Sequence, residues 1–269
     1  ISINFPTPSN NSTGVAHILE HSVLAGSKKF PVREPFFEMI KMSMATFINA
    51  MTDIDHTLYP VASNIPKDLF NLAEVYFDAV FNPLLTQQTF AREGHHLRFE
   101  NNNSDVSQLS LSGIVYNEMK GVFSNPDSML SRSISNHLLP DTIYAQESGG
   151  DPLEIPNLTY EDFKVFHSTY YHPSNAYLFA YGNINTHEYC KFIDEKIRNF
   201  VGKTTSFEID RQKKWQTPRT ILNHYPIGTS ESIKGKTFLL NAWLTGDALD
   251  PIETTLMHIL SLAVSGNEA

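Results

Sequence analysis

His17-Ile18-Leu19-Glu20-His21 places two imidazoles and one carboxylate within five consecutive residues. On an α-helix, residues four positions apart lie about 40° apart on one face, so His17 and His21 can reach the same ion. Glu20 projects beside them, where a carboxylate can take a proton from a zinc-bound water. The order His-x-x-Glu-His is the inverse of the commoner His-Glu-x-x-His pattern. The stretch therefore predicts a metal-binding helix with Glu20 as its general base.

The flanking residues favour a short, packed helix around this motif. Ser12 and Thr13 are candidate caps at its start, and Gly14 loosens the backbone there. Gly26 is typical of a helix end. An apolar stripe is supplied by Ile18, Leu19, Val23 and Leu24. A helix with incidental histidines is the alternative at this point.

A hydrolytic zinc site normally has three protein ligands and a water, so a third ligand must come from elsewhere. Glu118 is the best-placed candidate, because residues 113–121 have a helical apolar face on which a carboxylate would need a partner. Two alternatives stay open from the residues alone. Glu118 could be a solvated carboxylate that pairs with Lys120. One of His95 and His96 could be the ligand instead, but not both, because adjacent helical residues point about 100° apart.

Six blocks of sequence resemble the pitrilysin or insulinase group of metalloproteases, and most of all its presequence protease and falcilysin branch. They are residues 14–38 (GVAHILEHSVLAGSKKFPVREPFFE), 46–52 (TFINAMT), 59–63 (YPVAS), 113–121 (GIVYNEMKG), 148–156 (SGGDPLEIP) and 170–175 (YYHPSN). The resemblance implies that His17, His21 and Glu118 bind zinc and that Glu20 is the general base. The resemblance thus selects Glu118 among the candidate third ligands that periodicity leaves open.

Composition and charge are those of a globular chain. The 269 residues are 41% hydrophobic and 18% charged, which is enough for one large core or two smaller ones. No run approaches the roughly 18 apolar residues of a membrane span. The single cysteine, Cys190, excludes an intrachain disulfide. The formal charge of −9 argues against nucleic acid as a partner and favours basic peptides.

Helical and strand patterns alternate along the chain. Helical periodicity covers residues 35–42, 66–81, 86–95, 110–123, 127–138, 160–171 and 186–200. Strand character covers residues 1–5, 45–53, 56–62 and 176–182, with a hairpin turn at 53–56. These patterns predict an α+β fold in which helices pack on one face of a mixed, mainly antiparallel sheet. We expect this first domain, which carries the zinc site, to span residues 1–203.

The pattern restarts after a polar connector at residues 204–218. Residues 220–225 and 236–242 read as strands and residues 252–263 as a helix, so residues 219–269 are expected to begin a second, truncated α+β domain. In the family that the chain resembles, four such units form the two halves of a clamshell. The resemblance implies an N-terminal fragment whose missing C-terminal half supplies an Arg and a Tyr that bind the substrate carbonyl.

Asn49, Ala50 and Met51 are the candidate substrate-binding residues. Residues 49–52 read as an edge strand beside the zinc helix, to which an extended peptide could add by main-chain hydrogen bonds. An ordinary hairpin strand is the alternative. Phe36 and Phe37 could line a pocket, although paired aromatic residues at a helix start commonly belong to the core.

The sequence and the resemblance together predict a zinc metalloendopeptidase fragment, weakly active or inactive alone, whose parent hydrolyses short unfolded peptides. The alternative is a non-catalytic peptide-binding or scaffold module of the same fold. The intact motif argues against the alternative, because a scaffold has no need for Glu20 between two ligands. Relatives act in mitochondria, plastids and digestive vacuoles, so an organellar location is implied by the resemblance only.

Overall fold

The structure is a computed structural model that describes residues 1–33, 35–100, 108–204 and 207–265. Its centre is a five-stranded sheet with the order β2-β4-β1-β7, in which β3 also pairs with β4. The strands are β1 (Ser2–Pro6), β2 (Ala45–Ile48), β3 (Met51–Thr52), β4 (His56–Ser63) and β7 (Tyr177–Phe179). Every described pair of strands is antiparallel. The predicted α+β class with a mainly antiparallel sheet is confirmed.

One face of the sheet is buried and contributes side chains to the core. In β1, Ile3 and Phe5 are buried, and they lie opposite Tyr59 and Thr57 of β4, which are also buried. The residues between them point to the other face and stay partly exposed. This alternation has the period of two that a half-covered antiparallel sheet requires. The helices therefore cover one face, as the sequence pattern predicts.

The helices form where capping residues and apolar stripes coincide. Asn125, Thr159 and Asn185 each accept a hydrogen bond from a backbone N–H in the first turn of the helix that follows. The helices are α1 (Val15–Val23), α2 (Pro35–Met42), α3 (Pro66–Phe81), α4 (Gln87–Glu93), α5 (Ile114–Val122), α6 (Pro126–Leu138), α7 (Tyr160–Tyr170), α8 (Thr186–Ile197) and α9 (Pro251–Ser265). Short 3-10 turns lie at Ile143–Ala145, Ile155–Asn157 and Pro173–Asn175.

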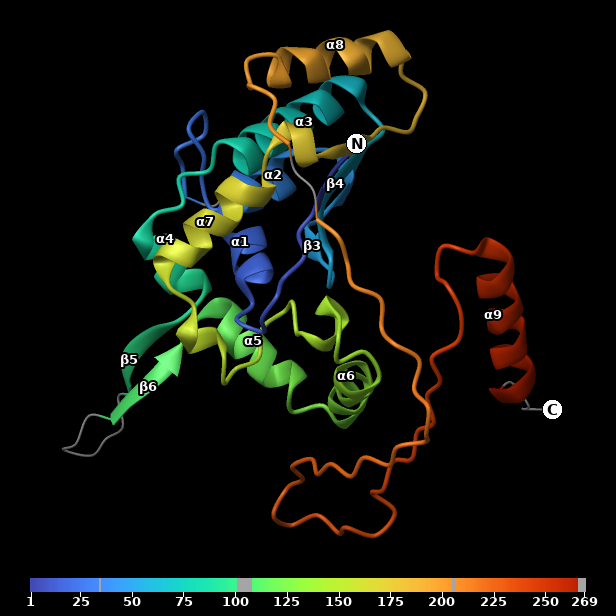
Figure 1. Ribbon diagram of the computed structural model, residues 1–269. Helices are drawn as coiled ribbons and strands as arrows, with labels where there is room; N and C mark the ends of the chain where they lie inside the picture. The colour runs from blue at the N-terminus through green and yellow to red at the C-terminus, as the bar shows by residue number, and fades with distance from the viewer. Residues whose placement is uncertain (34, 101–107, 205–206, 266–269) are drawn as a thin grey trace.

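Helices α1, α3 and α7 supply most of the core above the sheet, and α8 lies across α3 (Figure 1). Aromatic rings connect α8 to α3. The ring of Phe192 in α8 lies 5.1 Å from that of Phe70 and 5.5 Å from that of Phe77, both in α3. No described helix is long and apolar enough to cross a membrane. Among the predicted helices up to residue 200, all but the one over residues 110–123 agree with the structure to within a few residues.

Residues 110–112 contradict the prediction of a helix over residues 110–123. β5 (His96–Glu100) and β6 (Gln108–Ser112) pair antiparallel, from His96 opposite Ser112 to Glu100 opposite Gln108. This hairpin projects from the body in Figure 1, and the helix predicted over residues 110–123 starts only with α5 at Ile114. Residues 108–112 alternate polar and apolar side chains, which is a strand period that the adjoining helical pattern conceals.

The predicted caps of α1 are also wrong. Its N-cap is Gly14, with φ 71° and no side-chain cap. The hydroxyls of Ser12 and Thr13 bond to side chains of loop residues instead. Glycine adopts this left-handed conformation at little cost, so the backbone of Gly14 itself makes the turn into the helix. The helix ends at Val23, before Gly26.

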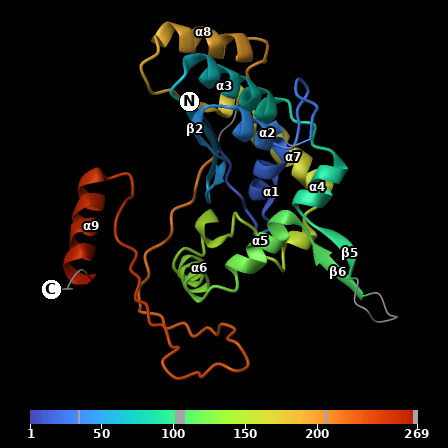
Figure 2. The same ribbon diagram turned by 180° about the vertical axis from the view of Figure 1, so that it is seen from behind.

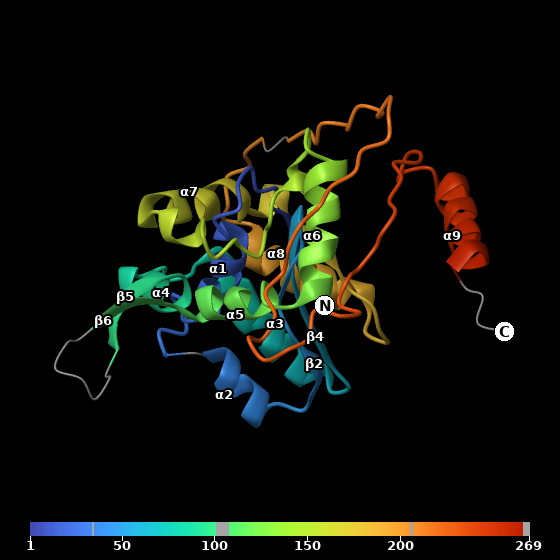
Figure 3. The same cartoon turned by 90° about the horizontal axis from the view of Figure 1, so that it is seen from below.

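The two strands predicted at residues 220–225 and 236–242 do not form in the described part of the chain. Leu222 is 82% exposed and Leu239 is 89% exposed, so neither has a core to join. Two strands are marginal without a third strand or a covering helix. Of the second domain predicted over residues 219–269, the described residues form the helix alone, as α9, which stands apart from the body in Figures 2 and 3.

Candidate metal centre

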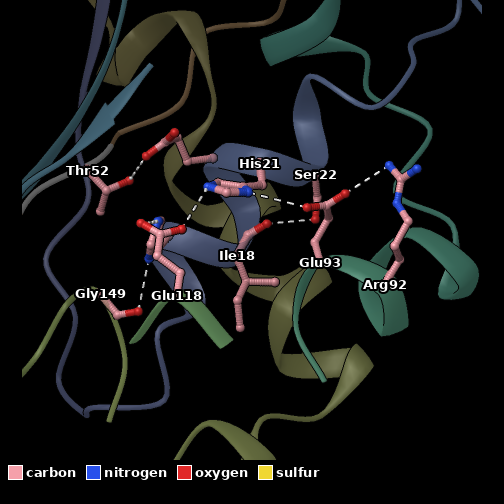
Figure 4. A network of polar contacts seen from close by, with 10 residues as sticks. Ile18, His21, Ser22, Thr52, Arg92, Glu93, Glu118 and Gly149 are labelled. Carbon is pink, nitrogen blue, oxygen red and sulfur yellow. Dashed lines mark hydrogen bonds and ion pairs between the residues drawn. The ribbon is translucent and has the colours of Figure 1, made fainter. Parts of the chain in front are cut away.

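Helices α1 and α5 bring three candidate ligands together. His17 and His21 lie one turn apart on α1, with ring centroids 4.9 Å apart, and Glu118 reaches them from α5. The Nε2 atom of His17 lies 3.7 Å from Glu118 Oε1, and that of His21 lies 3.9 Å from Glu118 Oε2. One donor atom from each residue falls within 4.8 Å of the others. Figure 4 shows His21 and Glu118 facing each other across this space.

The other nitrogen of each imidazole is already engaged. His17 Nδ1 lies 3.0 Å from the backbone oxygen of Gly149, and His21 Nδ1 lies 3.3 Å from Glu93 Oε2. A carbonyl and an ionised carboxylate can only accept, so each Nδ1 donates. In the neutral ring this leaves the lone pair on Nε2, which is the atom that faces Glu118. Both rings are therefore oriented as metal ligands require.

Close backbone packing holds the Gly149 carbonyl beside α1. A Cβ atom on Gly14 would lie 2.9 Å from the oxygen of Gly149 and 2.9 Å from Cα of Gly150. Only a residue without a side chain lets the loop approach the helix so closely. The loop at residues 149–152 thus carries the acceptor that orients His17.

Glu20 lies beside the three ligands and is buried, with 8% of its surface exposed. Its Oε2 accepts a hydrogen bond of 2.8 Å from the Oγ1 of Thr52, which belongs to β3 (Figure 4). A buried carboxylate without a partner would be costly, and the hydroxyl offsets part of that cost. The same bond fixes where the carboxylate points, on the side of the cluster nearest the sheet edge.

The cluster is electrostatically unbalanced without a cation. Burial lowers the pKa of His21, but the hydrogen bond that the ring donates to Glu93 and the charges of Glu20, Glu93 and Glu118 outweigh this effect, so the net pKa is raised. Three carboxylates around one ring favour a positive charge at this place. Two imidazole nitrogens and a carboxylate oxygen are also the donors of one known class of hydrolytic zinc site. The residues thus fit a zinc ion in both charge and donor type.

The alternative ligands from the sequence lie elsewhere. The Nε2 of His95 bonds with the oxygen of Leu158 at 3.1 Å, and the Nδ1 of His96 bonds with the oxygen of Ala91 at 2.7 Å. Lys120 reaches over the ring of its neighbour Tyr116, and none of the described ion pairs joins it to Glu118. The structure therefore groups Glu118 with His17 and His21 of α1. Among the described residues, His95 and His96 do not belong to this group.

A cavity of about 370 Å³ opens beside the cluster. Its wall includes the predicted pocket residues Phe36 and Phe37 and two of the predicted substrate-binding residues, Asn49 and Ala50. Met51 lies next to them on β3 but does not line the cavity, and 40% of it is exposed. β3 pairs with β4 on one side, and its other side has no strand partner in the described residues.

Three contributors to the site were missed by reasoning from sequence: Glu93, Thr52 and the carbonyl of Gly149. Glu93 carries no pattern that separates it from a surface carboxylate, yet only 5% of it is exposed. Thr52 ends the block at residues 46–52, and its role depends on a side-chain bond that no spacing predicts. The Gly149-Gly150 pair offers a usable signal, because adjacent glycines mark a close backbone approach.

Comparison with known proteins identifies the family of the chain. Residues 8–122 match the family described as "Insulinase (Peptidase family M16)", and residues 157–260 match the "Peptidase M16 inactive domain". Protein HypA of Clostridium perfringens is 47% identical over 99% of this chain, which covers 27% of that protein. Presequence protease 1, chloroplastic/mitochondrial, of Arabidopsis thaliana is 44% identical over 94% of this chain, which covers 23% of that protein.

The fold matches that of solved peptidases. The crystal structure of pitrilysin superposes with a TM-score of 0.57 and 22% sequence identity, covering 81% of this chain and 21% of pitrilysin. The chain thus spans about a quarter of the length of the curated relatives, at 27% and 23% of the two named above. With both domain matches belonging to one family and in chain order, the chain belongs to the insulinase family of peptidases, family M16.

Proposed function

We propose that this chain carries the metal site and the general base of a zinc metalloendopeptidase. His17 and His21 would hold the ion through Nε2, and Glu118 through a carboxylate oxygen. The observation that carries the proposal is that these donor atoms lie within 4.8 Å of one another while both Nδ1 atoms are engaged elsewhere. Side chains that merely happened to be close would not need both rings turned the same way.

The proposed reaction is hydrolysis of an amide bond. A zinc ion held by His17, His21 and Glu118 would lower the pKa of a bound water and polarise a carbonyl oxygen. Glu20 takes a proton from the attacking water and later passes it to the leaving amine, which is acid and base work by a single carboxylate. The Thr52 hydroxyl donates to Oε2 of Glu20 at 2.8 Å, so Oε1 is the oxygen that we assign to the proton transfer.

The proposed substrates are short unfolded peptides. An extended peptide can add to the open side of β3 by main-chain hydrogen bonds, with Asn49, Ala50 and Met51 as its nearest contacts. This mode of binding requires a substrate segment without its own tertiary structure. The formal charge of −9 favours basic peptides by long-range attraction. A peptide substrate also agrees with the name presequence protease that the Arabidopsis relative carries.

We further propose that efficient hydrolysis needs more of the polypeptide than this chain. The relatives are about four times as long, since the chain covers 27% of HypA and 23% of the Arabidopsis protein. The remaining part would close the open side of the cavity and supply the groups that bind the substrate carbonyl. The relatives named mitochondrial or chloroplastic support an organellar location as part of this proposal.

Glu20→Gln, made in the full-length protein that contains this chain, tests the proposal. Gln keeps the size of Glu but cannot take a proton, so zinc content should stay unchanged while cleavage of an unstructured basic peptide falls by about 10²–10⁴-fold. Glu161→Gln, on an exposed carboxylate of α7, is the matched control and should cleave as the wild type does. Undiminished cleavage by Glu20→Gln would refute the role of Glu20. A zinc-loaded wild type that binds the peptide without cleaving it would favour the scaffold alternative.

A further inference from the structure

We propose that Glu93 is a positioning residue that sets the tautomer and the direction of the His21 ring, and thereby the affinity of the site for zinc. Glu93 is the last residue of α4, far from the His-x-x-Glu-His motif in sequence. The inference rests on the proposed zinc function, but part of its test does not need the metal.

The burial of Glu93 first calls for an explanation. Only 5% of the residue is exposed, and a charged side chain is rarely so buried unless it is paired. Its Oε2 lies 3.3 Å from His21 Nδ1, and its Oε1 lies 2.8 Å from an Nη2 of Arg92 (Figure 4). Oε2 of Glu93 thus accepts a hydrogen bond from the His21 ring, while the guanidinium of Arg92 balances the negative charge at Oε1.

The two possible tautomers of His21 differ sharply in this environment. With the proton on Nδ1, the ring donates to Glu93, and the Nε2 lone pair points toward Glu118 Oε2, 3.9 Å away. With the proton on Nε2, a nitrogen lone pair would face the buried carboxylate and an N–H would point to where the metal binds. An ionised carboxylate offers no proton, so in the second arrangement the Nδ1 lone pair and the Glu93 carboxylate repel each other. Glu93 therefore selects the tautomer that can bind metal.

The packing around Glu93 makes this contact rigid. The next residue, Gly94, lies against α1 so closely that a Cβ atom on it would be 3.3 Å from Cγ2 of Ile18. A Cβ atom on Gly113, which precedes α5, would lie 2.0 Å from the oxygen of Gly94. The end of α4 is thus packed closely against both α1, which carries His21, and the start of α5, which carries Glu118. A carboxylate held in this way fixes the ring at little further entropy cost.

His17 provides an internal contrast. Its Nδ1 donates to a backbone oxygen, that of Gly149, at 3.0 Å. A side-chain substitution cannot remove that acceptor, whereas the acceptor of His21 depends on one side chain. Changes at residue 93 should therefore affect the His21 ring and leave the His17 ring as it is.

The first measurement is the zinc dissociation constant of the full chain, obtained by competition with a chelator. Glu93→Ala should bind zinc about 10- to 100-fold more weakly than the wild type, which is the usual effect of losing a partner of a ligating histidine. Glu93→Gln keeps an oxygen acceptor but loses the charge, and its affinity should fall between the two. Glu161→Gln changes an exposed carboxylate in α7 and should bind as the wild type does.

The second measurement needs no metal. Nitrogen NMR of the histidine rings, at a pH where they are neutral, reports which nitrogen carries the proton. In the wild type both His17 and His21 should carry it on Nδ1. In Glu93→Ala the signal of His21 should shift toward the Nε2–H form, while that of His17 stays unchanged. A purely structural role for Glu93 would not move one ring alone.

The outcomes separate the inference from the proposed function. Zinc binding by Glu93→Ala within about twofold of the wild type, with an unchanged His21 tautomer, would overturn the role of Glu93 and leave the zinc site standing. A wild-type chain that does not bind zinc would overturn the proposed function, and the tautomer measurement would still decide the role of Glu93. If Glu93→Ala does not fold, Glu93→Met, which has a similar size and no oxygen acceptor, replaces it in both measurements.

Discussion

Thr52 joins the edge strand β3 to the proposed general base. Its hydroxyl donates to Glu20 at 2.8 Å, so Thr52→Val, which keeps the shape but loses the donor, leaves the buried carboxylate without this partner. One such hydrogen bond contributes about 1.5 kcal/mol. We expect turnover of a peptide by the full-length protein to fall by about tenfold, with little change in KM. Steady-state kinetics check this.

Thr52→Ser is the matched variant, because it keeps the hydroxyl and loses only a methyl group. It should retain most of the turnover that Thr52→Val loses. Equal losses in both variants would mean that packing of the threonine methyl, and not the bond to Glu20, accounts for the effect.

We expect the ring of His167 to make the folded protein less stable at acidic pH. Burial lowers the pKa of this ring below 6.5, and its Nε2 donates to the oxygen of Val80 at 2.9 Å. As the pH falls below 6.5, the unfolded chain binds a proton that the folded chain excludes, so the free energy of unfolding decreases. Urea unfolding at pH values above and below 6.5 should show this loss, and His167→Gln should make it smaller. The same loss in both proteins would contradict the assignment.

The residues that carry the proposed chemistry could be recognised from sequence because spacing alone encodes them. His17 and His21 need only a helix to face one ion. Glu118 was harder, since periodicity left His95, His96 and a pairing with Lys120 open, and the structure groups Glu118 with the α1 histidines. The partners that orient the rings could not be predicted, because their roles arise from contacts between elements distant in sequence.

At the scale of elements, the close contact between the end of α4 and the start of α5 predicts that one added methyl group lowers both stability and zinc affinity. Gly113→Ala would place a Cβ atom 2.0 Å from the oxygen of Gly94, so the start of α5 must shift and Glu118 must move with it. We expect the free energy of unfolding to fall by about 1–3 kcal/mol and zinc binding to weaken. Chemical denaturation and chelator competition measure the two effects.

Gly121→Ala is the control in the same helix. Nothing lies within 4 Å of the Cβ atom that it adds. Alanine favours the helix over glycine, so this variant should be about 0.5–1 kcal/mol more stable, with unchanged zinc binding. If Gly113→Ala behaved like Gly121→Ala, the close approach of α4 and α5 would be refuted.

The elements that could be predicted are those with one dominant period. α2 and α3 have the bounds that the sequence predicts, Pro35–Met42 and Pro66–Phe81. The hairpin of β5 and β6 was missed because residues 108–112 run directly into an apolar helix, and a window that spans both favours the longer pattern. Periodicity identifies an element better than it locates a switch from one element to another.

At the scale of the whole molecule, the core ends at Phe200, just after α8. Among the described residues, every member of the core cluster and every hydrophobic residue packed against it lies at or before Phe200, whose ring lies 5.5 Å from that of Phe81. A chain that ends at Lys203 should therefore keep its helix content, its thermal midpoint and its zinc affinity. Circular dichroism and chelator competition check this, and they test the proposed domain boundary at residue 203.

A chain that ends at Gly182 is the contrasting case. It loses α8 and with it Tyr189, Phe192 and Phe200, which pack on α3. Each large aromatic side chain removed from a core costs about 3 kcal/mol or more, so this chain should be largely unfolded. Equal stability of the two truncated chains would contradict the assignment of α8 to the first domain.

The α+β class was predictable because the strands and helices before residue 200 pack on one another within the chain. In the segment after residue 207, Leu222 and Leu239 are exposed, and the strands predicted around them do not form in the described residues. Strand character in a sequence becomes a strand only where a neighbouring edge exists.

Zinc stoichiometry tests the central claim most directly. Elemental analysis of the zinc-loaded and desalted chain should give one zinc per chain for the wild type. Glu118→Ala removes one of three ligands and should lose the metal or bind it far more weakly, while remaining folded because Glu118 is exposed. No zinc in the wild type, or equal zinc in both proteins, would contradict the three-ligand site.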